Sequence, residues 1–185
     1  ALSLADADYA FVGENAGDWL GYAIGGGGDV DGDDLSDLLI SAVWNDDGGQ
    51  DAGKVYLVLG GSLGGSFSMG ADEADHVFVG EAAGDGLGVS VHDGGDVDGD
   101  GLSDVLLGAH HNDGGGEDAG RAYLLPGSSL DEVTLYMADA AHVFTGENAG
   151  DETGRFVAGL GDVDGDGLDD LLIASPWNDE VGSDA

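Results

Sequence analysis

The sequence carries three copies of a nine-residue acidic segment with the pattern Asp-Val-Asp-Gly-Asp-x-Leu-x-Asp. Carboxylates at positions 1, 3 and 5 can turn towards one point, and a fourth at position 9 can close the shell. Calcium takes six to eight oxygen ligands at about 2.3–2.6 Å, so this pattern predicts a Ca²⁺ site with a backbone carbonyl added at position 7. We expect about three ions, one per loop. The expected ligands are Asp29, Asp31, Asp33, Leu35 and Asp37 in loop one, Asp96, Asp98, Asp100, Leu102 and Asp104 in loop two, and Asp162, Asp164, Asp166, Leu168 and Asp170 in loop three.

Position 6 distinguishes loop one from the other two loops. It is Gly101 in loop two and Gly167 in loop three, but Asp34 in loop one. Glycine adopts a positive φ without steric cost, and Asp tolerates that region better than most residues. We therefore expect loop one to form the same turn and to bind its ion most weakly.

The residues after each loop exclude a helix-flanked calcium loop. An EF-hand needs an acidic ligand at position 12, but this position is Ile40, Leu107 or Ile173. Each of these residues lies in a short apolar run bounded by turn residues, as is typical of a buried strand. The calcium loops are therefore expected to lead into strands.

The acidic loops belong to a longer repeat of 66–67 residues, because they begin at residues 29, 96 and 162. We expect a partial repeat at 1–13, repeat one at 14–80, repeat two at 81–146 and a partial repeat three at 147–185. Short apolar runs separated by turns predict an all-β fold of β-propeller blades, each with four short antiparallel strands. A Gly/Ser-rich link without strands is expected before the fourth strand, and helix is expected nowhere. The expected strands are 9–13, 22–26, 38–43, 54–59, 76–80, 87–91, 105–109, 121–125, 142–146, 155–159 and 171–175.

Charge and composition limit the partners and the location of the protein. The chain has 39 acidic and 3 basic residues, for a net charge of −36, so it should repel nucleic acid and anionic membranes. No stretch has the roughly 18 apolar residues needed to insert into a membrane. Cysteine is absent, which excludes disulfides and Cys-based zinc sites. Calcium loops fill most readily where calcium is plentiful, which favours an extracellular or cell-surface location.

Several motifs that could perform catalysis lack the context that catalysis needs. Residues 60–64 match the G-x-S-x-G elbow of serine hydrolases, but no helix is expected after them. Residues 48–54 resemble a phosphate loop, yet Val55 replaces its Ser or Thr, so Lys54 is interpreted as a strand-edge cation beside an Asp-rich turn. His110 and His111 are expected on opposite faces of a strand, where they could not share a metal. We therefore expect no enzymatic activity.

Three recurring acidic pairs are interpreted as turn residues, with a weak second cation site as the alternative. Glu81 is expected on the surface, where its replacement should cost little. Trp44 and Trp177 follow the second strand of their repeats and are expected to cover the blade edge. The recurring pairs are Glu14 and Asp18, Glu81 and Asp85, and Glu147 and Asp151.

The combined motifs resemble the FG-GAP repeat of integrin α-subunit β-propellers and their bacterial relatives. The shared elements are Phe-x-Gly, then Gly-Asp-x-Asp-Gly-Asp-Gly-x-x-Asp, then Leu-x-Gly-Ala-x and Gly-x-x-Tyr-Leu, over nearly the whole chain. The Gly-Ala-Pro element is degenerate here. In that family the nine-residue loop binds calcium, and about seven blades close into a ring. The resemblance implies that these residues are part of a longer protein, or that they assemble head to tail.

The expected function is that of a calcium-stabilised extracellular scaffold or adhesion surface. Its partners would be a protein or glycan ligand on a cell surface, and further blades of the same protein or further copies. An accessory propeller of a larger secreted enzyme and a subunit of a surface filament are the alternatives left open by the sequence.

Overall fold

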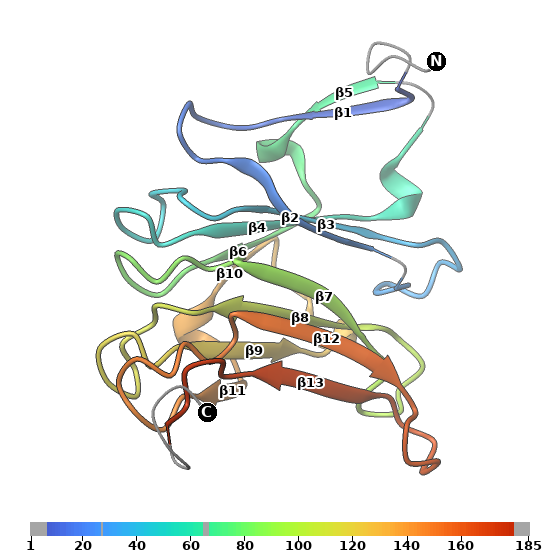
Figure 1. Cartoon of the computed structure of the whole chain (residues 1–185). Coiled ribbons are helices and arrows are strands. Elements are labelled where there is room, and N and C mark those ends of the chain that lie inside the picture. Colours follow the sequence, from blue (N-terminus) through green and yellow to red (C-terminus); the bar gives the residue numbers. More distant parts are fainter. Residues whose placement is uncertain (1–6, 27, 65–66, 180–185) are drawn as a thin grey trace, which may run out of the picture.

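The strands of each repeat form an antiparallel sheet, and successive sheets stack face to face (Figure 1). The computed structural model describes residues 7–26, 28–64 and 67–179. Blade one has the strand order β2-β3-β4-β6 and blade two has the order β7-β8-β9-β11. The strands of these two blades are β2 (Leu20–Gly26), β3 (Leu38–Ala42), β4 (Lys54–Val58), β6 (His76–Val79), β7 (Ser90–Gly95), β8 (Asp104–Ala109), β9 (Arg121–Leu125) and β11 (His142–Thr145).

Parts of two further blades flank these sheets. β12 (Phe156–Gly161) and β13 (Asp170–Ala174) pair antiparallel and correspond to the first two strands of blade three. β1 (Tyr9–Val12) corresponds to the last strand of a blade that precedes blade one. The all-β fold with four antiparallel strands per blade is thus confirmed.

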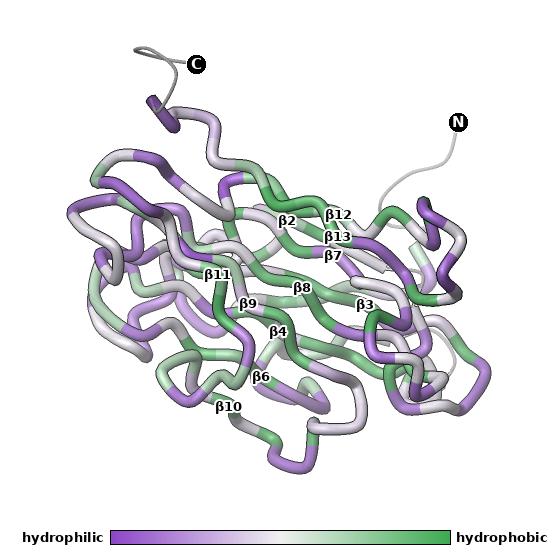
Figure 2. The backbone as a smooth tube through the Cα atoms, turned by 90° about the horizontal axis from the view of Figure 1, so that it is seen from below, coloured by the Kyte–Doolittle hydropathy of each residue, from purple (hydrophilic) through white to green (hydrophobic). Residues whose placement is uncertain are grey.

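The middle strands are mostly apolar because both of their faces are buried between stacked sheets. In β4, Val55 and Leu57 face the core between blades one and two, whereas Tyr56 and Val58 belong to a second core on the other side. Figure 2 shows hydrophobic strands between hydrophilic loops. The continuous apolar runs in the sequence follow from this arrangement, since alternation appears only where one strand face meets water.

The links that were expected to lack strands each contain one. β5 (Phe67–Gly70) pairs in parallel with β1, and β10 (Thr134–Tyr136) pairs in parallel with β6. Each of these strands extends the sheet of the preceding blade and does not pair with the blade of its own repeat. Short 3-10 turns also occur within the links, at Gly60–Ser62, Ala71–Glu73, Gly127–Ser129 and Met137–Asp139.

The first strand of blade two begins later than expected, at Ser90 and not at Leu87. Gly86 and Gly88 on either side of Leu87 have φ values of +64° and +88°, which lie outside the strand region. Leu87 instead forms an isolated bridge with Gly53 and is fully buried. Within the described residues, no helix is long and apolar enough to cross a membrane.

Candidate metal centre

The three acidic loops occupy equivalent places in the three blades. Each loop joins the first strand of its blade to the second, and all three lie on the right-hand side of the molecule in Figure 1. Each second strand begins at or just after the last Asp of its loop. Stacking of the blades therefore places the three loops side by side.

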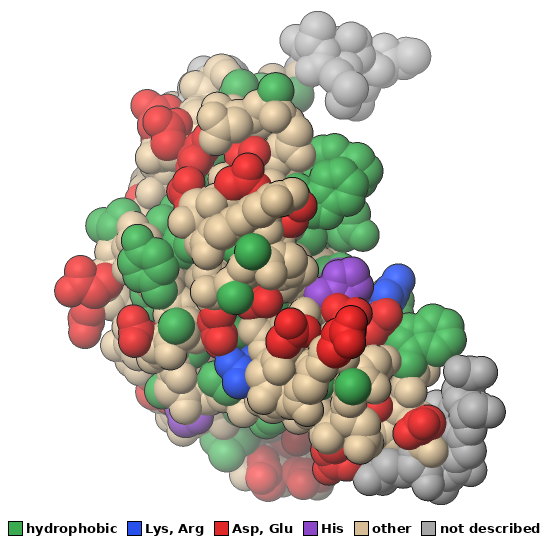
Figure 3. Space-filling model, turned by 90° about the vertical axis from the view of Figure 1, so that its left-hand side faces the viewer, with side chains coloured by type: hydrophobic (Ala, Val, Ile, Leu, Met, Phe, Trp, Pro, Cys, Tyr) green, Lys and Arg blue, Asp and Glu red, His purple; other side chains and the backbone are tan. Residues whose placement is uncertain are grey.

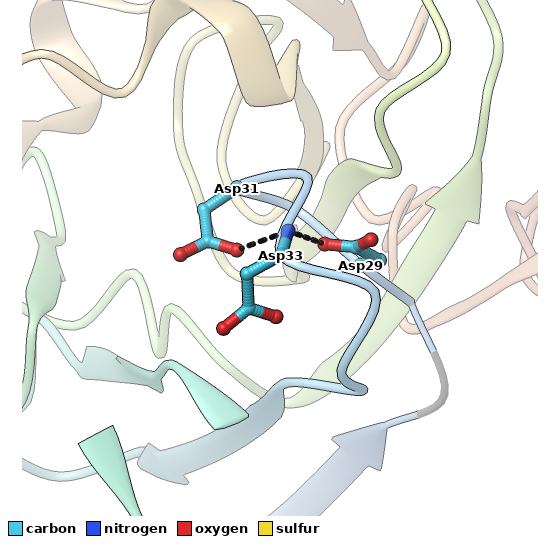
Figure 4. A group of neighbouring side chains, drawn as sticks. All are labelled: Asp29, Asp31 and Asp33. Carbon is cyan, nitrogen blue, oxygen red and sulfur yellow. Dashed lines mark hydrogen bonds between the residues drawn. The ribbon is translucent and has the colours of Figure 1, made fainter. Parts of the chain in front are cut away.

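The first Asp of each loop organises the turn through its own carboxylate. Asp29 Oδ1 accepts hydrogen bonds from the backbone N–H groups of Gly32 and Asp33, at 2.7 and 3.1 Å, and its Oδ2 accepts one from Asp34 at 2.8 Å. Figure 4 shows the Asp33 N–H between the carboxylates of Asp29 and Asp31. Asp96 and Asp162 accept the same three bonds in their loops. These bonds hold the carboxylates in place before any ion arrives.

The backbone at position 6 is left-handed in all three loops, as the sequence predicts. Its φ value is +66° at Asp34, +91° at Gly101 and +95° at Gly167. An Asp at this position adopts the same turn, at a steric cost that glycine does not have.

Three carboxylates converge in each loop. One oxygen from each member of a group lies within 4.8 Å of the others. Oxygens bound to one calcium ion at about 2.3–2.6 Å can be at most about 5 Å apart, so this spacing fits a single ion. The groups are Asp29, Asp31 and Asp33 in loop one, Asp96, Asp98 and Asp100 in loop two, and Asp162, Asp164 and Asp170 in loop three.

The last Asp of loops one and two lies outside these groups and is buried. Asp37 accepts a hydrogen bond from Val30 N–H at 2.7 Å and another from Gly60 N–H at 2.8 Å. Asp104 accepts the equivalent bonds from Val97 and Gly127. Burial raises the pKa of both carboxyls, and the other carboxylates of each loop raise it further, whereas the backbone N–H groups lower it. These residues tie the loop to the following link.

Position 5 and position 7 also form a repeated contact. The N–H groups of Leu35, Leu102 and Leu168 donate to the Asp two residues earlier, at 2.8–2.9 Å. Asp166 makes this contact although it is not in the loop-three group, where Asp170 takes its place. A hydrogen bond from Ser128 and one from Leu102 N–H lower the pKa of Asp100.

Neighbouring loops are hydrogen-bonded to each other through position 1 of one loop and position 8 of the next. Asp29 N–H donates to Ser103 Oγ at 3.2 Å, and Ser103 N–H donates to the Asp29 carbonyl at 2.8 Å. Asp96 N–H donates to the Asp169 carboxylate at 2.9 Å, and Asp169 N–H donates back at 3.0 Å. The backbone of each first ligand is therefore held by the neighbouring loop, a contact that single-repeat motifs do not reveal.

On the opposite side of the sheets, each blade has an Asp–Asn pair, which is buried in blades one and two and partly buried in blade three. Asn45 Nδ2 donates to Asp18 at 2.9 Å, and Asn112 Nδ2 donates to Asp85 at 2.6 Å. Asn178 makes the same contact with Asp151 at 3.2 Å. Burial raises the pKa of Asp85, which the bond from Asn112 counteracts. The recurring Asp and Asn residues thus join the two turns of each blade.

The recurring Glu residues pair with the cations of strand three. Glu81 accepts two hydrogen bonds from Arg121 Nη1, both at 2.8 Å, and a third from Tyr123 Oη at 2.8 Å. Its side chain is 17% exposed, so the expectation that it lies on the surface is wrong. The partners were missed because they lie 40 and 42 residues away in sequence. Glu14 binds Lys54 and Tyr56 in the same way in blade one.

The position of Lys54 confirms the prediction that it is a cation beside the Asp-rich turn. Its Nζ lies 2.7 Å from Asp47 Oδ2 and 2.7 Å from Glu14 Oε1, and its side chain is 8% exposed. In repeat three the described residues include no third strand, and Glu147 is exposed. The recurring Glu therefore forms an ion pair in the blades whose third strand supplies a cation.

A hollow of about 470 Å³ on this face is lined by aromatic residues of blade one and two histidines of blade two. Trp19, whose φ is +57°, packs against Trp44 with a centroid distance of 3.9 Å and an angle of 32° between the ring planes. A bulky residue with positive φ is a genuine outlier. Figure 3 shows hydrophobic side chains and histidine close together near one margin of this face, among scattered acidic groups. The residues lining the hollow are Trp19, Tyr22, Val43, Trp44, Asp51, Gly84, Gly86, His110 and His111.

The expectation that the two histidines face away from each other is wrong. Their rings stack with a centroid distance of 3.7 Å, because they lie in the turn after β8 and not within a strand. His110 Nδ1 is buried and has no hydrogen-bond partner among the described residues. Trp44 and Trp177, which were expected to cover the blade edge, are 44% and 49% exposed.

We predict that the His110 imidazole stays neutral until the pH falls to about 4. Burial is the largest cause of this lowered pKa, and His111 and Arg155 lower it further. The pH dependence of the Hε1 chemical shift in NMR spectra measures it directly. Replacing His111 with alanine should move the midpoint to higher pH. A midpoint near the ordinary value of about 6.5 in the unmodified chain would contradict the buried geometry.

The comparisons with known proteins agree with this geometry. Residues 153–185 match the model of the FG-GAP repeat family. Integrin alpha-PS2 of Drosophila melanogaster is 29% identical over 180 residues, which is 94% of this chain and 12% of that protein. Integrin alpha-5 of Xenopus laevis is 32% identical over 91 residues, 46% of this chain and 8% of that protein. The chain thus spans a small part of these relatives. Together with the repeated loops and four-stranded sheets, these matches support the assignment of the chain as an FG-GAP repeat protein.

Proposed function

We propose that the chain is a calcium-binding, extracellular β-propeller segment that serves as a scaffold or adhesion surface. The observation that carries this proposal is the convergence of three carboxylates in each of three equivalent loops. In a protein with a net charge of −36, such groups repel each other unless a cation lies between them. Oxygen ligands in a turn that the backbone already holds favour calcium over zinc, which prefers nitrogen and sulfur.

Calcium would act structurally in this proposal. Asp29, Asp31 and Asp33 would hold the ion in loop one, with the Leu35 carbonyl and Asp37 completing the shell as the sequence predicts. The ion would fix the turn between the first two strands of the blade. Since adjacent loops share hydrogen bonds between positions 1 and 8, an ordered loop would also support its neighbour.

The adhesion part of the proposal is supported by the similarity to integrin alpha subunits and by the hollow on the opposite face. Exposed Trp19, Tyr22 and Trp44 supply large aromatic surfaces, which are enriched where proteins bind partners. Asp51 adds a carboxylate at the same place. A cationic group of a protein partner could interact there with the aromatic ring faces and with the Asp51 carboxylate. We therefore propose a protein ligand at this hollow.

Calorimetric titration of the calcium-free chain tests the calcium assignment. We expect about three sites, with loop one weakest because Asp34 carries the cost of a left-handed backbone. Magnesium should bind more weakly, since it demands a smaller octahedral shell. Tight zinc binding without calcium binding would refute the proposal.

A further inference from the structure

The links between strands three and four follow a rule that both examples obey. β5 lies in the link of repeat one and pairs in parallel with β1, with Met69 opposite Phe11. β10 lies in the link of repeat two and pairs in parallel with β6, with Leu135 opposite Phe78. Phe11 and Phe78 occupy the same repeat position. Each link therefore covers the outer edge of the preceding blade before the chain returns to its own blade.

β11 is the corresponding outer strand of blade two, and its sheet ends there among the described residues. Val143 and Phe144 are 38% and 42% exposed, whereas their blade-one counterparts Val77 and Phe78 are 9% and 0% exposed. A bare strand edge with apolar side chains is a ready template for another strand. Within this molecule, two such edges are covered by a parallel strand: β1 by β5, and β6 by β10.

We propose that the outer edge of β11 is a docking site for a parallel strand from the link of the FG-GAP repeat that follows blade two. The strand that fits carries an apolar residue opposite Phe144, as Met69 and Leu135 do in the two examples. Two residues later it enters a 3-10 turn that begins with a buried residue, Ala71 or Met137. This inference goes beyond the calcium-dependent scaffold, because no acidic loop takes part in the contact.

The blade-one contact fixes the register of the docked strand. Val77 N–H donates to the Val133 carbonyl at 2.7 Å, and His76 Nδ1 lies 3.0 Å from the Glu132 carbonyl. Val143 and His142 are the counterparts of Val77 and His76 in blade two. The Val143 N–H therefore points away from β9 and is the donor that an added strand would use.

A peptide with the sequence of residues 131–141 tests the proposal on the full chain in saturating calcium. Fluorescence anisotropy of the labelled peptide should show saturable binding. Hydrogen exchange should show new protection at residues 142–145. A peptide with aspartate in place of Leu135 should not bind, since it places a charge opposite Phe144. Absence of binding by the parent peptide, or protection confined to another strand, would overturn the proposal.

Val143→Pro removes the outward N–H while leaving the bonds from β11 to β9 in place, because proline is tolerated on an edge strand. It should weaken peptide binding about tenfold, the size expected for one backbone hydrogen bond. Phe144→Asp should weaken binding without any backbone change, which guards against a folding defect in the proline variant. The matched control is Phe156→Asp, on blade three at a side chain that is 61% exposed, and it should bind normally. Equal binding by all three variants would refute docking at β11.

Discussion

Replacing Asp98 with alanine is expected to remove one of about three bound calcium ions and to destabilise the chain when calcium is saturating. The variant keeps Asp96 and Asp100, which then repel each other without a third ligand to hold the ion. At a calcium concentration about 100 times the dissociation constant, one ion contributes about 2.7 kcal/mol to the free energy of unfolding. Thermal unfolding with and without calcium, together with the calorimetric site count, measures both effects.

Comparing the stability of the variant and the parent chain without calcium makes this test more specific. Without calcium, Asp98→Ala should be as stable as the parent chain or slightly more stable, because it relieves repulsion within the loop. Glu117→Ala is the matched control: it removes the same charge from an exposed residue outside the loops. It should leave the site count unchanged. If both variants lose the same stability in saturating calcium, Asp98 is not a ligand.

Replacing Glu81 with alanine is expected to lower the free energy of unfolding by about 3 kcal/mol, the lower end of the range for breaking a buried ion pair. The change leaves the Arg121 guanidinium, whose side chain is 23% exposed, without its carboxylate. It also removes the acceptor of the Tyr123 hydroxyl, which is buried. Urea unfolding at neutral pH gives the free energy directly.

Glu147→Ala is the matched control for Glu81, because repeat three has the same residue at the same position but no described third strand to pair with it. Both variants change the net charge equally, so the relief of general repulsion cancels between them. The Glu147 variant should change stability by no more than about 0.5 kcal/mol, as is usual for exposed sites. A similarly small effect at Glu81 would mean that the ion pair with Arg121 contributes little.

The geometry within a loop could be predicted from the sequence because it depends on residues close together in the chain. The alternation of Asp29, Asp31 and Asp33 predicted that their carboxylates converge, and the structure brings them together. The special conformation at position 6 was also predictable, since few residues tolerate a positive φ. The strands of each blade followed from apolar runs bounded by turns, to within about four residues.

Contacts between distant residues could not be predicted in this way. Nothing local marks β5 and β10 as strands, because each pairs with an edge that a different repeat supplies. The stacking of His110 on His111 depends on where β8 ends, which an alternating pattern does not specify. The hydrogen bonds of position 8 of a loop could not be predicted either, because they are made to the loop of the neighbouring blade.

The sequence by itself determined the repeat, the all-β fold and the acidic loops, because periodic apolar residues and turn-forming glycines act over a few residues. The tertiary structure alone decided which distant groups the buried carboxylates face. It buries Glu81 against Arg121, joins Asp85 to Asn112 and turns the carboxylate of Asp37 towards backbone N–H groups. The physical reason is that a carboxylate removed from water needs a donor or a cation, and the stacking of blades selects which distant group provides it.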